Sequence, residues 1–149
     1  AVLKPAGTTT EAVRDGLAAA LRSAGRAASV SCVSRLDVPT SGVLPLALGG
    51  ERSGAAQWLQ AQFAARQVSK EYLCLCAGQQ SLGPPGTEGE IDGPLLVTDG
   101  DCDGQRVVVS PLGKDARTRY KVLEALPLET ADVALLLLRP QTGRTHQIR

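Results

Sequence analysis

A continuous aliphatic run at residues 133–138 constrains the fold of this chain more than any other feature. The run shows no alternation of polar and apolar side chains, and it is far too short to cross a membrane as a helix. Such a run is typical of a strand inside a sheet rather than at its edge. We therefore expect residues 132–139 to form a strand in the middle of a sheet, preceded by a strand over residues 116–126.

Two other segments carry apolar residues at helical spacing and predict helices. The first begins near Thr10, which we expect to be the N-cap, and ends before Gly25. The second covers residues 53–66, and we expect Trp58 and Phe63 on its apolar side to lie in the core. Shorter stretches predict strands at residues 1–7, 30–33, 43–48, 69–78, 90–96 and 106–110.

The order of these segments decides the fold class. Strands and helices do not alternate regularly, so repeated parallel β-α-β units are not predicted. The sequence predicts an α+β fold, with a mainly antiparallel mixed sheet and flanking helices. Its 149 residues suit a single domain with its own core. We expect residues 1–149 to be one domain that continues beyond both ends, because the sequence contains no Met and begins inside an apolar run.

Charge and cysteine content limit the kinds of partner that the sequence predicts. The 16 Lys and Arg residues nearly balance the 15 Asp and Glu residues, so a nucleic-acid partner would have to be held locally. The four cysteines form no Cys-x-x-Cys pair, and His146 lies far from all of them in the sequence, so no metal site is predicted. We expect reduced thiols and an intracellular protein with no membrane partner.

Residues 34–42 place one carboxylate, Asp37, among turn-forming residues directly before a predicted strand. A proline and Gly42 within this stretch favour a sharp bend. An aspartate in such a bend commonly caps the turn and has no further role. A catalytic role is the alternative. Arg35 and the cationic segment 143–149 at the far end of the chain favour that alternative.

Four separated motifs follow one another along the chain. They are Lys-Pro-Ala-Gly at residues 4–7, Arg-Leu-Asp with Thr-Ser-Gly at 35–42, Lys-Glu-Tyr-Leu at 70–73, and Gly-Arg-Thr-His-Gln-Ile-Arg at 143–149. In this order they resemble the RluA-type pseudouridine synthases, which isomerise uridine in RNA. The resemblance covers residues 4–149. It implies the pseudouridine synthase catalytic-domain fold, an RNA partner such as rRNA, tRNA or another structured RNA, and no cofactor.

The resemblance also implies roles for single residues. Asp37 matches the catalytic aspartate, which attacks the ribose or otherwise assists cleavage of the N-glycosidic bond. Tyr72 matches the residue that stacks on the target base and helps to remove its C5 proton. Arg149 matches the cation that pairs with the aspartate. We therefore expect Asp37, Tyr72 and Arg149 to converge in one cleft.

Other residues of these motifs are expected to bind the RNA. Arg35 resembles the wedge that enters the helix when the uridine is flipped out, and Ile148 resembles the aliphatic neighbour of the target base. Ser34 stands where the family commonly has His. Site support and RNA contacts are expected from Arg144, Thr145, His146 and Gln147. The compartment is left open between the cytoplasm, the mitochondrion and the plastid.

Two other functions stay open at this point. A catalytically silent relative could keep the fold and only bind or remodel RNA. A hydrolase could use Asp37 as its nucleophile or base, although no clear second carboxylate accompanies it. The presence of Asp37, Tyr72 and Arg149 together favours the isomerase, because a silent protein has no physical need for all three.

Overall fold

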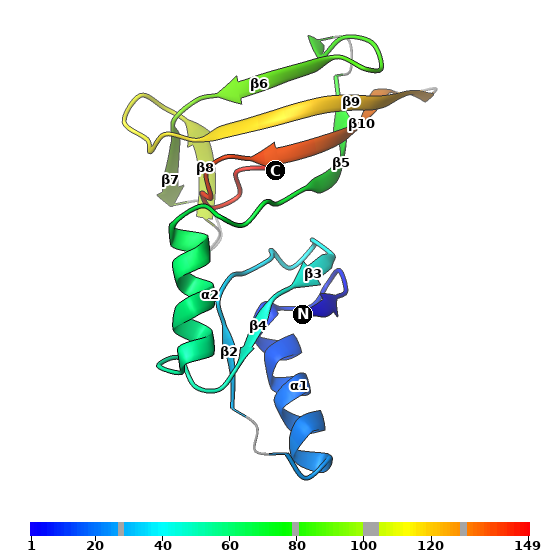
Figure 1. Cartoon of the computed structure of the whole chain (residues 1–149). Coiled ribbons are helices and arrows are strands. Elements are labelled where there is room, and N and C mark those ends of the chain that lie inside the picture. The colour runs from blue at the N-terminus through cyan, green and yellow to red at the C-terminus, as the bar shows by residue number, and fades with distance from the viewer. Residues whose placement is uncertain (27–28, 79–80, 100–104, 129–130) are drawn as a thin grey trace. The chain divides into compact units, whose positions relative to one another are not determined.

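The computed structural model describes residues 1–26, 29–78, 81–99, 105–128 and 131–149, and it divides into two compact units (Figure 1). The first unit spans Ala1–Val68 and the second spans Ser69–Arg149. Every strand pair in both units is antiparallel within these residues. The α+β fold class and the mainly antiparallel pairing predicted from the sequence are confirmed.

The first unit contains two helices and two small strand pairs. Its elements are β1 (Val2–Lys4), α1 (Thr10–Ser23), β2 (Val30–Cys32), β3 (Gly42–Leu44), β4 (Leu46–Leu48) and α2 (Gly54–Ala64). Strand β1 pairs with β3, and β2 pairs with β4. Strand β2 precedes the loop that carries Asp37 and β4 follows it, so the β2–β4 pair joins the chain before this loop to the chain after it.

Both predicted helices form, but the N-cap of the first is one residue earlier than expected. The Thr9 hydroxyl accepts a hydrogen bond from the Ala12 N–H at 3.1 Å, so Thr9 is the N-cap and Thr10 is the first helical residue. Gly25 follows the helix with a φ of 69°, as a glycine at this position permits. Helix α2 is capped in the same way by Ser53.

Two expectations for the first unit are wrong. Residues 43–48 are not one buried strand, because the chain breaks at Pro45 into β3 and β4, which pair with different partners. Trp58 does not lie in the core, since 62% of its surface is exposed. The buried side chain of α2 is Ala56. Periodicity identified the helix but not the face that packs.

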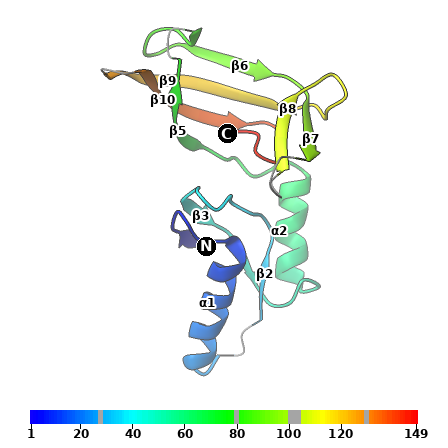
Figure 2. The ribbon, with the colours of Figure 1, turned by 180° about the vertical axis from the view of Figure 1, so that it is seen from behind.

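The second unit contains six strands and no α-helix within the described residues. They are β5 (Tyr72–Ala77), β6 (Glu88–Asp92), β7 (Leu95–Asp99), β8 (Gln105–Val109), β9 (Arg117–Leu128) and β10 (Ala131–Pro140). Four of them form a sheet in the order β5-β10-β9-β6, and β7 pairs with β8 (Figures 1 and 2). The aliphatic run of β10 therefore lies inside the sheet, which confirms its predicted central position.

One face of this sheet forms the core of the second unit. Val122 from β9 and Ala134, Leu136 and Leu138 from β10 are buried together. Side chains from β5 pack against this cluster, namely Tyr72, Cys74 and Cys76. On the other face of β5, Leu73 and Leu75 are 69% and 66% exposed. The predicted alternation of β5 is confirmed.

Candidate active site

Buried hydrogen bonds fix the backbone of the loop directly before Asp37. Thr10 is 3% exposed, and its hydroxyl donates to the Leu36 carbonyl oxygen at 3.1 Å. The same hydroxyl oxygen accepts from the Leu36 N–H at 3.2 Å. One side chain of α1 thus satisfies both backbone groups of the residue before Asp37.

The backbone directly after Asp37 is held by residues of the Lys-Pro-Ala-Gly motif at 4–7. The Lys4 side chain is completely buried, and its Nζ donates to the carbonyl oxygens of Thr8 at 2.6 Å, Pro5 at 3.1 Å and Val38 at 3.2 Å. Its three donors are all used, which is what makes a buried ammonium tolerable. The Gly7 N–H also donates to the Val38 carbonyl oxygen, at 2.8 Å.

Asp37 itself lies in a turn and is half-buried. The Thr40 N–H donates to the Asp37 carbonyl oxygen at 3.0 Å, which closes the turn. Arg35 on the same loop is exposed. Because the backbone is held on both sides, the Asp37 side chain extends from a fixed position. A group that must meet one atom of a substrate needs such a position.

In the second unit, Tyr72 and Ile148 pack against the same buried cluster. Both side chains pack against the buried cluster of β9 and β10, although one comes from β5 and the other from the last residues of the chain. Tyr72 is half-buried and lies opposite Leu138 of β10. The predicted base-stacking tyrosine and the predicted aliphatic neighbour of the base thus share one face of one sheet.

The segment 142–149, which we call the terminal turn, is folded onto the start of β9. The Arg144 Nε donates to the Asp115 carbonyl oxygen at 2.9 Å. His146 has a φ of 53°, a left-handed conformation that is uncommon for a residue other than glycine. The Arg149 N–H donates to the His146 carbonyl oxygen at 3.1 Å. Arg149 is exposed and His146 is half-buried.

The expected site residues are therefore divided between the two units. Arg35 and Asp37 belong to the first unit, and the others belong to the second, namely Tyr72, Arg144, Thr145, His146, Gln147, Ile148 and Arg149. The convergence of Asp37, Tyr72 and Arg149 in one cleft stays a prediction.

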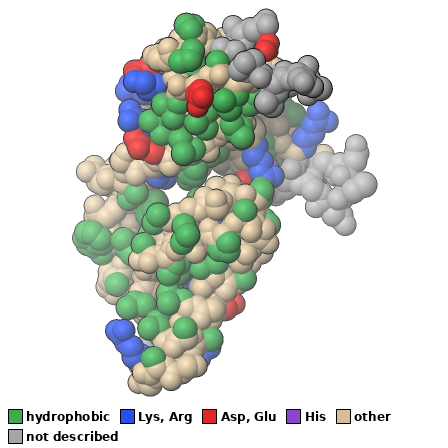
Figure 3. All heavy atoms as spheres, turned by 90° about the vertical axis from the view of Figure 1, so that its right-hand side faces the viewer, with side chains coloured by type: hydrophobic (Ala, Val, Ile, Leu, Met, Phe, Trp, Pro, Cys, Tyr) green, Lys and Arg blue, Asp and Glu red, His purple; other side chains and the backbone are tan. Residues whose placement is uncertain are grey.

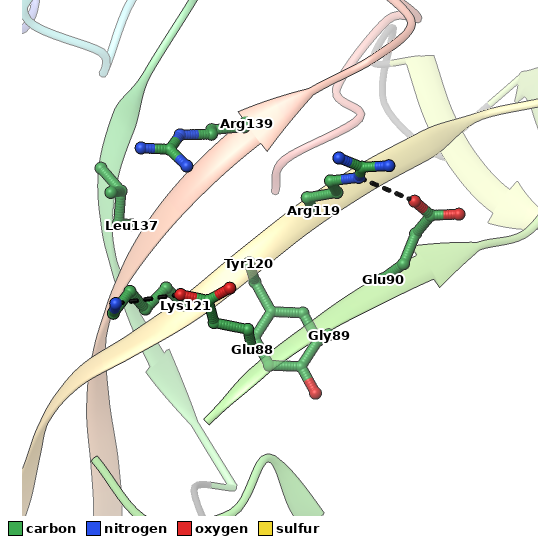
Figure 4. Close-up of a pocket in the computed structure, with 8 residues that line it drawn as sticks. All are labelled: Glu88, Gly89, Glu90, Arg119, Tyr120, Lys121, Leu137 and Arg139. Carbon is green, nitrogen blue, oxygen red and sulfur yellow. Dashed lines mark hydrogen bonds and ion pairs between the residues drawn. The ribbon is translucent and has the colours of Figure 1, made fainter. Parts of the chain in front are cut away.

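The exposed face of the sheet has a hollow of about 370 Å³ that contains none of these residues (Figure 4). Arg119 of β9 lies opposite Arg139 of β10, and each cation has an acidic partner. Glu90 lies 3.2 Å from Arg119, and Glu71 lies 2.7 Å from Arg139. Lys121 likewise pairs with Glu88, which lowers the pKa of the Glu88 carboxyl. Paired charges of this kind offer little net attraction to phosphate.

Hydrophobic and charged side chains share the surface of the second unit (Figure 3). A second hollow of about 370 Å³ lies between β7 and the terminal turn, and it is lined in part by Lys114, Gly143 and Arg144. Of these two hollows, only the second borders one of the four motifs, the motif at residues 143–149.

Three of the four cysteines lie within the described residues. Cys32, Cys74 and Cys76 are free thiols, and no group of three potential metal ligands exists among the described residues. Cys102 lies outside the described residues. Burial raises the pKa of the Cys74 thiol and, in the first unit, that of Cys32. No helix within the described ranges is long and apolar enough to cross a membrane.

Sequence reasoning did not find the residues that hold the motifs in place. The sequence indicates Lys4 only as part of a motif and Thr10 only as a helix cap. It gives no indication of a role for Thr142. A lysine inside an otherwise apolar strand was the one available signal for Lys4. Nothing in a single sequence indicates that Thr10 would bond to Leu36, because the two are far apart in the chain.

Comparison with known proteins decides the family. The sequence model of the RNA pseudouridylate synthase family matches residues 1–149. The chain belongs to the RNA pseudouridylate synthase family. The match covers every residue that the four motifs singled out. The resemblance to RluA-type pseudouridine synthases is thereby confirmed.

Curated members of the family are similar over most of this chain. It is 35% identical over 150 residues to the ribosomal large subunit pseudouridine synthase C of Vibrio vulnificus, covering 98% of this chain and 43% of the relative. It is 38% identical over 117 residues to the dual-specificity RNA pseudouridine synthase RluA of Escherichia coli, covering 78% of this chain and 48% of the relative. The chain thus spans about half the length of these relatives.

A solved structure of the family has the same fold. The human RNA pseudouridylate synthase domain containing 4 superposes with a TM-score of 0.68 at 28% sequence identity. The superposition covers 99% of this chain and 57% of the human chain. A pseudouridylate synthase structure is therefore matched along almost all of the sequence.

Proposed function

We propose that the protein isomerises uridine in RNA to pseudouridine, with Asp37 as the catalytic carboxylate. The observation that carries this proposal is the family match over residues 1–149, which includes all four motifs. The rigid backbone on both sides of Asp37 supports it, because a group that only caps a turn does not require such fixation. Residues 1–149 would form part of one catalytic domain.

The reaction needs few groups. The bond between ribose C1′ and uracil N1 breaks, the detached uracil turns within the site, and a new bond forms between C1′ and C5. The C5 proton then leaves, and N1 gains a proton. Substrate and product are isomers, so neither an oxidant nor a reductant is consumed. A carboxylate near C1′, a proton acceptor near C5 and a pocket that retains the uracil suffice.

Each proposed residue has one task in this scheme. Asp37 acts at C1′, either as a nucleophile or by assisting departure of the base. Tyr72 stacks on the uracil and helps to remove the C5 proton. Arg149 pairs with Asp37 and orients it through charge-assisted hydrogen bonds. Ile148 packs beside the base, which agrees with its packing against the same buried cluster as Tyr72.

The base must leave its stack before this chemistry can occur. Arg35 is exposed on the Asp37 loop and is proposed to fill the space that the extruded uridine vacates. Arg144 and His146 are proposed to contact the RNA backbone. The RNA would be a ribosomal, transfer or other structured RNA. Because local cations would hold this RNA by its phosphates, its affinity for the protein should fall as the salt concentration rises.

The experiment incubates the full-length protein with candidate structured RNAs, digests the RNA to nucleosides, and separates them by liquid chromatography. An isomerase converts uridine to a nucleoside of the same mass but different retention, with no free uracil. A hydrolase would release uracil and leave abasic sites. A silent RNA-binding relative would bind RNA and change no nucleoside. Either of the last two outcomes, on an RNA that the protein binds, would overturn the proposal.

A further inference from the structure

We propose that Gln147 is a positioning residue which, together with Thr142, clamps the terminal turn to strand β9 and so presents Ile148 and Arg149 to the substrate. This inference rests on the proposed function for its catalytic consequence. The clamp itself is a property of the folded protein. The sequence predicts site support and RNA contact for Gln147, and the clamp specifies how it would give the first.

The Gln147 amide makes four hydrogen bonds within the protein. Its Oε1 accepts from the Thr142 hydroxyl at 2.8 Å and from the Arg144 N–H at 2.9 Å. Its Nε2 donates to the Arg117 carbonyl oxygen at 3.0 Å and to the Thr118 Oγ1 at 3.0 Å. The first two bonds lie within the terminal turn, and the other two reach strand β9.

These partners also fix which way the amide points. The Arg144 N–H can only donate, so it must face the amide oxygen. The Arg117 carbonyl can only accept, so it must face the amide nitrogen. A glutamine amide offers two acceptor positions and two donor hydrogens, and all four are used here. A base or phosphate could bond to this amide only by displacing one of the internal partners.

Thr142 completes the clamp. Its hydroxyl donates to Gln147 and accepts from the Arg117 N–H at 2.9 Å. Arg117 is thus bound at its N–H by Thr142 and at its carbonyl by Gln147. Both clamp side chains are half-buried, so water competes with these bonds less than at an exposed site.

The clamp lies between the core and the proposed catalytic end of the chain. Gln147 directly precedes Ile148, which packs against the buried cluster, and Arg149 follows. Strand β9 also carries Val122, a member of that cluster. Loosening the terminal turn from β9 would therefore displace Ile148 and Arg149 together. Displacements of about 1 Å in a catalytic constellation can cost on the order of 10²-fold in rate.

The test uses the full-length protein and compares Gln147→Leu with Thr142→Val, two changes that keep side-chain volume and remove clamp bonds. We expect each to lower kcat by between about 10-fold and 10²-fold while KM and RNA affinity stay within about twofold. The double variant should be no slower than the slower single variant, because both changes open the same clamp. Thr142→Ser, which keeps the hydroxyl, should restore nearly full turnover.

The matched control is Gln141→Leu. Gln141 lies just before the clamp, is exposed, and donates from its side chain only to the Arg139 carbonyl oxygen at 3.2 Å. This variant should keep the kcat of the parent. If Gln147→Leu instead raised KM and weakened RNA binding at unchanged kcat, and Thr142→Val had no effect, Gln147 would contact RNA directly and the clamp proposal would be wrong.

Amide hydrogen exchange without RNA separates the clamp from the proposed activity. The backbone amides of Arg117 and Arg144 bond to clamp side chains, so they should exchange at least about tenfold faster in Thr142→Val and Gln147→Leu, respectively, than in the parent. Unchanged exchange at both amides would refute the clamp even in an active enzyme. Faster exchange in a protein that leaves uridine unchanged would refute the proposed function alone.

Discussion

At the residue scale, Asp37 stands between Leu36 and Val38, whose backbone groups form hydrogen bonds with buried side chains. Thr10 bonds to both polar groups of Leu36, and Lys4 bonds to the Val38 carbonyl oxygen. Neither side chain needs to reach the substrate to matter. The backbone around Asp37 is therefore held by Thr10 of α1 and by Lys4 of the Lys-Pro-Ala-Gly motif.

Thr10→Val should therefore impair both folding and catalysis. Valine keeps the shape of threonine but leaves the N–H and carbonyl of Leu36 without their buried partner, at a cost of about 1–3 kcal/mol. We expect a corresponding loss in the free energy of unfolding, measured with urea, and a fall in turnover of at least about tenfold. Thr10→Ser keeps the hydroxyl and should retain most of both. Equal behaviour of the two variants would contradict this role of Thr10.

The Cys74 thiol should react slowly with iodoacetamide near neutral pH. The thiolate is the reactive form, and burial raises the pKa of Cys74, so less thiolate is present at a given pH than in an ordinary exposed thiol. Its alkylation should therefore become rapid only at a higher pH than for glutathione. Mass spectrometry of peptides after timed alkylation measures this, with the urea-unfolded protein as control. Alkylation of folded Cys74 as fast as that of glutathione at pH 7 would refute it.

At the scale of elements, sequence patterns predicted what depends on local periodicity. The central place of β10 followed from an aliphatic run, and the two faces of β5 followed from alternation. Sequence patterns did not predict the features that depend on tertiary packing, namely the N-cap residue of α1 and the buried face of α2. Three threonines, residues 8–10, stand together at the start of α1. Thr10 is buried and bonded to the Leu36 backbone, and Thr9 is the cap. In α2 the buried residue is the small Ala56, whereas the large Trp58 is exposed.

Two glycine-to-alanine substitutions should have opposite effects on stability. Gly16 lies inside α1 with open space where a Cβ would be, so Gly16→Ala should stabilise the protein by about 0.5–1 kcal/mol. At Gly113 a Cβ would lie 2.4 Å from the Leu95 carbonyl carbon, which is backbone and cannot rotate away. Gly113→Ala should destabilise by about 1–3 kcal/mol. Denaturant titration measures both, and shifts of the same sign would contradict this reading of the packing.

At the scale of the whole molecule, the proposed catalytic residues come from two compact units. Asp37 belongs to Ala1–Val68, whereas Tyr72 and Arg149 belong to Ser69–Arg149. The motifs in the sequence identified the family, and the comparisons confirmed it. The internal bonds of Lys4, Thr10, Thr142 and Gln147 could not be predicted, because they depend on backbone and side-chain groups that only the folded chain brings into hydrogen-bonding geometry.

The substitution Asp37→Asn in the full-length protein tests whether Asp37 is the catalytic carboxylate. Asparagine nearly matches aspartate in volume but lacks the negative charge and the nucleophilic oxygen. RNA affinity should remain, because it comes mostly from cations that contact phosphate. Asp15→Asn is the matched control, since Asp15 is exposed on α1 of the same unit and pairs with Arg14 at 2.8 Å.

The measurement is tritium release from RNA that carries C5-labelled uridine, made beside filter binding of the same RNA. We predict that Asp37→Asn lowers tritium release by at least about 10²-fold and leaves binding within a few-fold, while Asp15→Asn matches the parent in both. Tritium release by Asp37→Asn within a few-fold of the parent would contradict the assignment of Asp37 as the catalytic group.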